Sequence, residues 1–154
     1  MGFRILGLAA EPFAELFSLP DEALAAHRAV RVTADASPGY PCRISLTDAA
    51  PGEEVILVHY QHHATDSPFR SSYAIYVRAG ERMFDEVDRV PQVLRSRLLS
   101  LRAFDAQGML LDADVVEGGD VETLIARLFA NARVAYIHVH FARPGCYAAL
   151  VERA

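Results

Sequence analysis

The sequence predicts an α+β domain built on a bent, mainly antiparallel sheet, with helices covering its core face. Helical patterns occur near the start and again late in the chain, and strand patterns with a period of two occupy the region between them. No internal repeat interrupts this order. At 154 residues the chain has the length of one domain, so we expect residues 1–154 to fold as a single unit.

The first elements expected are one strand and two short helices. Residues 3–8 have a strand pattern, and residues 12–18 and 21–28 have helical patterns. Proline is favoured at the start of a helix, so Pro20 predicts that the second helix begins there. The carboxylate of Asp21 suits the unpaired N–H groups of its first turn.

Strand patterns then dominate the chain. They are expected at residues 30–34, 42–46, 55–60, 73–78, 98–104, 109–116, 134–141 and 147–152. A helical turn is expected within residues 91–97. A longer helix is expected over residues 121–132, where apolar residues recur at helical spacing and Asp120 is placed to cap the first turn.

The hairpin that joins strands 98–104 and 109–116 has a register that the sequence predicts. A three-residue loop places Gly108 where φ is positive, and it pairs Arg102 with Asp112 across the two strands. The same register collects apolar residues on the opposite face. A slip of one residue would exchange the two faces of a strand, so this pattern favours the stated register.

The last hairpin, around Pro144 and Gly145, has two interpretations. A two-residue turn puts Cys146 on the apolar face of the strand pair. A three-residue loop puts Cys146 on the face of His138 and His140. The sequence leaves both interpretations open.

Composition excludes several classes of protein. The net charge is −5, all fifteen basic residues are arginine, and they form no basic run, so we expect no nucleic-acid partner. No apolar run is long enough for a membrane span, and no signal-peptide pattern precedes the first element, so we expect a cytoplasmic protein without a membrane partner. Two cysteines about a hundred residues apart are expected to be reduced thiols.

Four short motifs carry a resemblance to a known family. They are Pro-Gly-Tyr-Pro-Cys-Arg at 38–43, Pro-Gly-Glu at 51–53, Asp-Ser-Pro-Phe-Arg at 66–70 and Arg-Pro-Gly-Cys-Tyr at 143–147. Together they resemble a family of bacterial proteins known as a domain of unknown function, number 1203, and the resemblance covers essentially the whole chain. It implies a single-domain bacterial protein, and it assigns no activity, cofactor or substrate.

The main functional hypothesis is a pocket that binds a small acidic molecule. Arginine, histidine, serine and tyrosine are concentrated near the ends of predicted strands, and guanidinium groups bind carboxylates and phosphates well. His59 is expected to point into the domain, whereas His62 and His63 are expected in a solvated loop. The residues expected to bind the ligand are Arg43, His59, Arg70, Arg143 and Tyr147.

An alternative is a metal- or thiol-dependent enzyme. His138 and His140 share one face of a strand, and Cys146 or His59 would complete a site for a divalent metal such as zinc. No cofactor motif is evident, and a pair of polar residues on a half-exposed face is the more common meaning of such a pattern. Cys42 alternates with apolar residues and is expected in the core. A third hypothesis is an interaction module that forms a homodimer through an exposed sheet edge.

Overall fold

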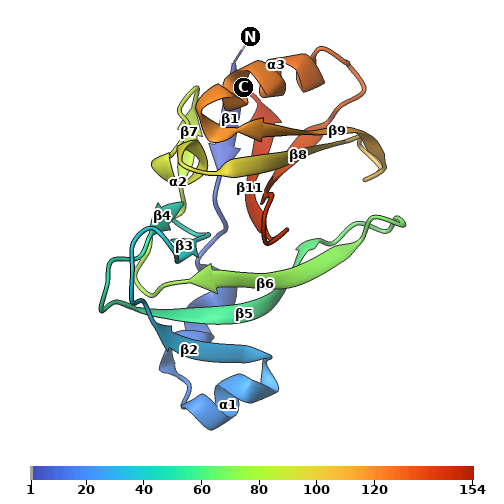
Figure 1. Ribbon diagram of the computed structural model, residues 1–154. Helices are drawn as coiled ribbons and strands as arrows, with labels where there is room; N and C mark the ends of the chain where they lie inside the picture. Colours follow the sequence, from blue (N-terminus) through green and yellow to red (C-terminus); the bar gives the residue numbers. More distant parts are fainter. Residues whose placement is uncertain (1) are drawn as a thin grey trace.

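The computed structural model describes residues 2–154, and its strands form two sheets (Figure 1). The first sheet has six strands in the spatial order β7-β1-β11-β10-β8-β9, and all its pairs are antiparallel. In chain order these strands are β1 (Phe3–Leu6), β7 (Asp85–Val87), β8 (Leu98–Phe104), β9 (Leu110–Glu117), β10 (Tyr136–Phe141) and β11 (Tyr147–Arg153). The α+β class is confirmed, with the strands divided between two sheets.

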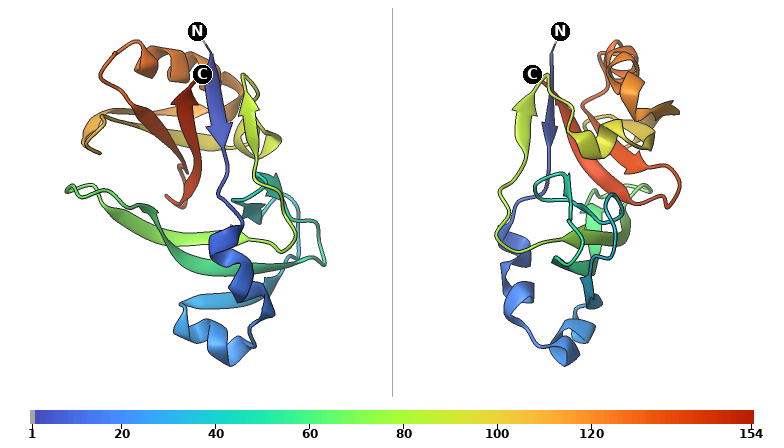
Figure 2. Two further views of the ribbon diagram at one scale, coloured as in Figure 1. Left: turned by 180° about the vertical axis from the view of Figure 1, so that it is seen from behind. Right: turned by 60° about the vertical axis from the view of Figure 1, so that its left-hand side comes forward.

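The second sheet has five strands in the order β2-β5-β6-β3-β4. They are β2 (Ala29–Thr33), β3 (Pro41–Cys42), β4 (Thr47–Asp48), β5 (Glu54–His63) and β6 (Ser71–Val77). Only β3 and β6 run parallel, and they pair at a single position. The two sheets lie one above the other in the views of Figures 1 and 2, and β11 approaches β6 between them.

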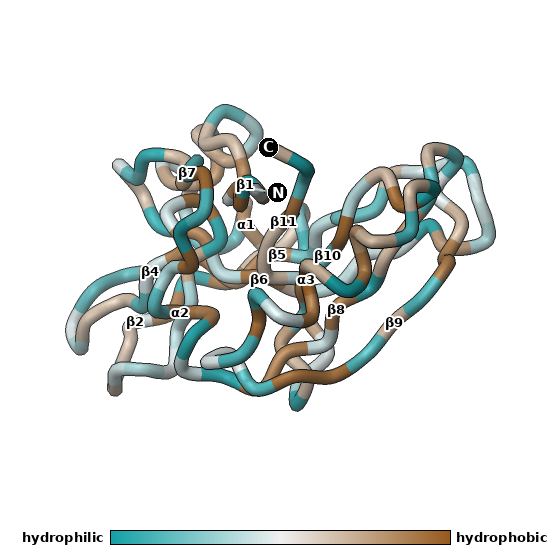
Figure 3. The backbone as a smooth tube through the Cα atoms, turned by 90° about the horizontal axis from the view of Figure 1, so that it is seen from above, coloured by the Kyte–Doolittle hydropathy of each residue, from teal (hydrophilic) through white to brown (hydrophobic). Residues whose placement is uncertain are grey.

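Short helices cover one face of each sheet. The longest, α3 (Val121–Phe129), packs on the first sheet together with α2 (Gln92–Arg95) and the 3-10 turn η2 (Gly118–Asp120). The 3-10 helix η1 (Glu11–Ser18) and α1 (Asp21–Ala26) pack on the second sheet. In the view from above, hydrophobic stretches of α3 and β8 overlie each other, as their shared core requires (Figure 3).

Side-chain alternation in β10 assigns the two faces of the first sheet. Ile137, Val139 and Phe141 belong to the core under α3, where burial of apolar surface stabilises the fold by about 25 cal/mol per Å². His138 and His140 therefore point to the opposite face, toward the second sheet. Helix α3 begins at Val121 as predicted, although the side chain of Asp120 makes no capping hydrogen bond.

The predicted strand at 42–46 is wrong. Only Pro41 and Cys42 are in a strand, and the chain then turns, with Leu46 at a φ of 55°. The backbone of residues 43–44 connects the two sheets, because the Arg43 carbonyl accepts from Leu8 N–H and the Ile44 carbonyl accepts from Phe84 N–H. Because the chain turns after Cys42, its side chains no longer alternate between two faces as in a strand. Arg43 therefore lies inside the molecule and not on an exposed face.

The β8–β9 register is as predicted only near its turn. Gly108 has the expected positive φ, and Phe104 pairs with Leu110. A bulge then inserts Leu111, and beyond it the pairing is displaced by one residue, so that Arg102 lies opposite Ala113 and not opposite Asp112. A bulge of this kind reverses the faces of every later residue on its strand.

Two adjacent glycines at the start of η2 allow a test of how closely this turn packs against the backbone of α2. A Cβ on Gly118 would lie 1.9 Å from the carbonyl oxygen of Leu94, whereas a Cβ on Gly119 would meet nothing within 4 Å. We expect Gly118→Ala to lower the free energy of unfolding by about 2–3 kcal/mol, because a rigid backbone atom must move. Gly119→Ala should change it by less than about 0.5 kcal/mol. Denaturant unfolding of both variants measures the difference, and equal values would contradict this packing.

Candidate functional site

The family-like motifs at 38–43 and 143–147 meet at one cleft between the two sheets. The cleft has a volume of about 500 Å³, and within residues 2–154 no aspartate or glutamate lines it. The first motif contributes Pro38, Gly39, Pro41 and Arg43, the second contributes Arg143, Pro144 and Cys146, and the remaining lining residues are Tyr76, Ser96, Arg97, Leu98 and Phe141. Segments a hundred residues apart in the sequence therefore line one site, and they meet where Arg43 contacts Cys146.

Arg43 is the central charged group of this cleft. Its side chain is 1 % exposed, and none of the acidic residues in the described chain contacts it. Its Nε donates to the Tyr147 carbonyl at 2.7 Å, one Nη donates to the Pro41 carbonyl, and the other donates to Cys146 Sγ at 2.9 Å. Burial lowers the pKa of the guanidinium from its usual value. Arg43 therefore forms no salt bridge with an acidic residue of the described chain.

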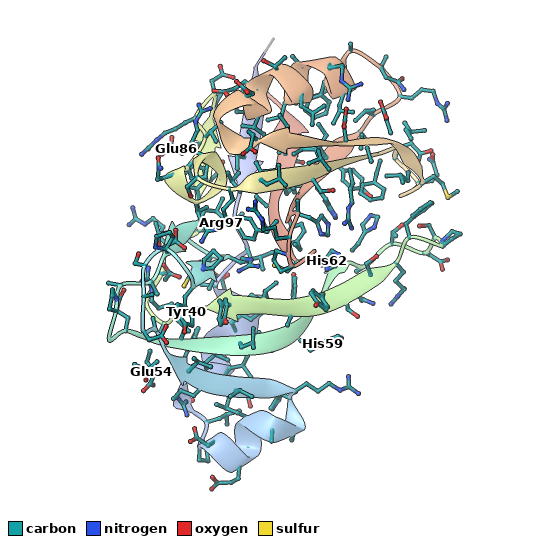
Figure 4. The ribbon with its side chains drawn as sticks, in the orientation of Figure 1. Tyr40, Glu54, His59, His62, Glu86 and Arg97 are labelled. Carbon is teal, nitrogen blue, oxygen red and sulfur yellow. The ribbon has the colours of Figure 1, made fainter. Side chains whose placement is uncertain are left out.

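A second arginine, Arg97, lines the cleft from the short segment between α2 and β8. Arg97 makes a two-nitrogen ion pair with Asp48, with distances of 2.7 and 3.2 Å, and it also donates to the Val93 carbonyl. The guanidiniums of Arg97 and Arg43 lie 5.0 and 4.9 Å from the centre of the Phe141 ring, a cation–π arrangement. Figure 4 shows Arg97 between the sheets. Sequence analysis missed Arg97 because no motif surrounds it.

Arg143 completes the positive charge of the site. It is exposed on the β10–β11 loop, and no hydrogen bond or ion pair is formed by its side chain within residues 2–154. The loop has four residues, because Phe141 N–H donates to the Cys146 carbonyl and Gly145 N–H donates to the Phe141 carbonyl. The cleft thus carries two arginines without an acidic partner and one arginine that has such a partner.

The loop also settles which face Cys146 occupies. Cys146 lies opposite Phe141 and is buried in the core beneath the cleft, so it does not join His138 and His140. A bulge at Ala148 then places Tyr147 opposite His140. The predicted grouping of Cys146 with the two histidines is corrected accordingly, since the residue that joins them is Tyr147.

Histidines form a separate cluster between the sheets. The ring of His62 lies 5.2 Å from that of His140 and 6.2 Å from that of His138, and it stacks on Tyr147 at 5.2 Å. His63 packs against His138 at 4.7 Å. The predicted solvated loop for His62 and His63 is therefore wrong, because β5 continues through them.

A bulge in β5 explains this error. The pairing with β6 shifts by one residue between Tyr60 and His63, which reverses the faces beyond that point. His59 precedes this bulge; it points outward and is exposed, with Nε2 3.1 Å from the Ser72 hydroxyl, instead of pointing into the domain as predicted. Figure 4 shows His62 between the sheets and His59 farther from the first sheet.

The cluster histidines are held in the neutral form. Burial lowers the pKa of His138 to about 2 and that of His140 to about 3. Burial, followed by the charge of His63, lowers the pKa of His62 to about 4. His140 donates through Nδ1 to the Gly145 carbonyl, whereas the Nδ1 atoms of His62 and His138 are buried without a hydrogen-bond partner in the described chain.

The cluster does not have the geometry of a metal centre. Among residues 2–154, no group of three or more histidine, cysteine, aspartate or glutamate side chains converges so as to hold an ion. The ring arrangement instead resembles a packed aromatic core, in which tilted and edge-to-face pairs are favourable. The predicted metal ligands His138 and His140 are thus together, but with Tyr147 and His62 as neighbours.

Of the five predicted ligand-binding residues, the structure brings three to the cleft region. Arg43 and Arg143 line the cleft, and Tyr147 supplies a backbone carbonyl to Arg43 while its buried ring joins the histidines. Burial raises the pKa of the Tyr147 hydroxyl. His59 and Arg70 lie elsewhere, and Arg70 contacts Thr65 and Gln61 at the exposed end of the β5–β6 hairpin.

These features define a two-sheet α+β protein with an arginine-lined cleft where its sheets meet. Residues 39–153 match the family described as protein of unknown function (DUF1203), so the chain belongs to that family. No curated protein and no solved structure matches the chain. In the described part of the chain, no helix has the length and apolar character needed to cross a membrane.

Proposed function

We propose that the cleft between the sheets binds a small acidic molecule. The observation that carries this proposal is Arg43, a buried guanidinium that lines the cleft and contacts no carboxylate of the described residues. A buried charge is costly unless it is paired, so an anion in the cleft would improve its environment. Arg143, exposed and unpaired in the described chain, is placed to contact the same anion.

The composition of the cleft narrows the ligand class. Leu98, Tyr76 and the prolines give it an apolar wall, and no acidic residue lines it to repel an anion. A guanidinium recognises carboxylates and phosphates through paired hydrogen bonds. We therefore infer a small organic acid or phosphate monoester with an apolar part, rather than an inorganic anion alone.

The histidine strand supports the alternative, a metal-dependent enzyme, less well. Its imidazoles are neutral and grouped, but their rings pack against each other and against Tyr147. The cleft has open volume beside three arginines. A hollow of about 590 Å³ also borders His63 and His138, but no arginine lines it, and Glu152 does. Binding in the cleft is the function that this arrangement favours.

A ligand screen with matched arginine variants tests the proposal. Thermal shift and calorimetry with monocarboxylates, dicarboxylates and phosphate monoesters should identify binders, with affinity that falls as salt is added. Arg143→Gln should weaken the best binder by about 10-fold or more, since a charge-assisted hydrogen bond contributes about 1.5–3 kcal/mol. Arg143 is exposed, so its replacement should leave stability nearly unchanged.

Arg70→Gln is the control. Arg70 is also an exposed arginine, but it lies on the β5–β6 hairpin, away from the cleft. Its replacement removes the same charge and should leave affinity within about twofold of the unmodified protein. A panel without binders, or equal weakening by the two variants, would contradict a specific site in the cleft.

A further inference from the structure

Cys146 forms part of the wall of the arginine cleft and contacts its buried charge. Its Sγ accepts a hydrogen bond from Arg43 at 2.9 Å, and the residue is 9 % exposed. The other two hydrogen-bond acceptors of the Arg43 guanidinium are the backbone carbonyls of Pro41 and Tyr147, which carry no charge. Cys146 is therefore the one contacting group of the described chain that can carry a negative charge.

Some N–H donors of Arg43 are free to bind an incoming anion. A guanidinium has five N–H donors, and those of Arg43 make three hydrogen bonds within the described chain. Two donors of a nearly fully buried cation are thus without an acceptor beside an open cleft. One Nη of the same guanidinium contacts Cys146 Sγ, so an anion bound to the free donors would lie beside this sulfur.

Among the described residues that line the cleft, none is a carboxylate or a histidine that could act as acid or base toward Cys146. The charged groups there are Arg43, Arg97 and Arg143, and the carboxylate of Asp48 is occupied by Arg97. His138 and His140 lie on the opposite face of β10. A reaction at Cys146 therefore has no side chain to protonate a leaving group, and it requires a group that departs as a stable anion.

We propose that Cys146 exchanges with acidic low-molecular-weight disulfides bound in the cleft. The Cys146 thiolate attacks one sulfur of the disulfide, a new S–S bond forms to Cys146, and the other half departs with the bonding electron pair as a thiolate. The disulfide is the oxidant, and no proton transfer is needed. This inference rests on the proposed anion site, because the arginines both hold the acid groups and stabilise the departing thiolate.

Cys42 provides an internal control for this chemistry. It is fully buried, and burial raises the pKa of its thiol to about 12. Cys42 is therefore unsuited to attack the mixed disulfide at Cys146, so a second thiol from solution would release the adduct. The expected product is a reversible adduct at one cysteine.

The test uses 5,5′-dithiobis(2-nitrobenzoate), an aromatic disulfide with two carboxylates, and neutral 4,4′-dithiodipyridine. At about pH 7 we expect Cys146 to react with the acidic disulfide roughly 10-fold or more faster than a free thiol, since the arginines of the cleft concentrate the dianion beside its Sγ. Intact-mass and peptide analysis should place one adduct on Cys146, present in Cys42→Ser and absent in Cys146→Ser. Arg143→Gln should slow the acidic probe several-fold and leave the neutral probe unchanged.

Three outcomes overturn the inference. If Cys146 reacts no faster than a free thiol with the acidic probe, it is not an exchange site, even where Arg143→Gln still weakens binding of organic acids. If both probes react quickly and Arg143→Gln alters neither rate, the thiolate is reactive but acid recognition fails, and the proposed function fails with it. Equal labelling of Cys42 and Cys146 also contradicts the assignment.

Discussion

Replacing Arg43 by methionine is expected to lower the free energy of unfolding by about 3 kcal/mol or more. Methionine fills much of the same volume but donates no hydrogen bonds, so the carbonyls of Pro41 and Tyr147 lose their guanidinium donor inside the protein. Each buried polar group left unpaired costs about 1–3 kcal/mol. The cation–π contact with Phe141 is lost as well.

Denaturant unfolding at constant pH measures this effect, and two further variants sharpen it. Arg43→Lys keeps the charge but lacks the planar fork that reaches three acceptors, so it should recover only part of the loss. Arg127→Met removes an arginine that is half exposed and paired with Asp114, and it should cost less than about 1 kcal/mol. If Arg43→Met costs no more than Arg127→Met, Arg43 does not hold the two sheets together.

The second large effect is a loss of stability in mild acid. His62, His138 and His140 have folded-state pKa values of about 4, 2 and 3, below the value of about 6.5 in an unfolded chain. Between these values the unfolded chain binds more protons than the folded chain. The stabilisation is thus complete above about pH 6.5 and is lost as the pH falls toward the folded-state values.

Each neutral buried histidine adds a slope of up to about 1.4 kcal/mol per pH unit below pH 6.5. Equilibrium unfolding at several pH values between about 7.5 and 5 gives the total slope. His138→Gln should reduce it by about one proton, whatever the variant does to absolute stability. The control His59→Gln removes an exposed histidine, and it should leave the slope unchanged. If the pH dependence of the free energy of unfolding corresponds to an uptake of less than one proton, the buried histidines are not held in the neutral form.

The sequence predicted most elements because their apolar spacing is regular. Helix α3 and strands β5, β6, β8, β10 and β11 lie close to their expected residues, since a period of 3.6 or 2 is visible over each. The three-residue strand β7 was missed, because it is exposed and too short to show a period. The division into two sheets was also missed, since strand patterns do not state which strands pair.

Bulges account for the largest errors about side-chain direction. One residue inserted near His62 moved His62 and His63 inward, another at Leu111 displaced the β8–β9 pairs, and a third at Ala148 brought Tyr147 to the histidines. A single inserted residue has no signature in hydrophobic alternation, yet it reverses every side chain that follows.

Part of the candidate site was accessible from the sequence and part was not. Arg43 and Arg143 were identified because they stand in dense Pro-Gly motifs, which fix backbone turns and place polar side chains at strand ends. Arg97 and Phe141 depend on long-range packing, for which a single sequence carries no local signal. The burial of Arg43 also followed from a turn where a strand was expected.

The cleft is lined by two segments that lie about a hundred residues apart in the sequence, and this separation affects when the cleft can form during synthesis. Residues 38–43 are synthesised about a hundred residues before Arg143 and Cys146, so the cleft cannot form until the β10–β11 hairpin has been made. A bound acid would then favour the closed arrangement of the two sheets over any partly assembled form by mass action. Ligand supply would thereby influence how much of the newly made protein persists, in addition to any activity of the finished molecule.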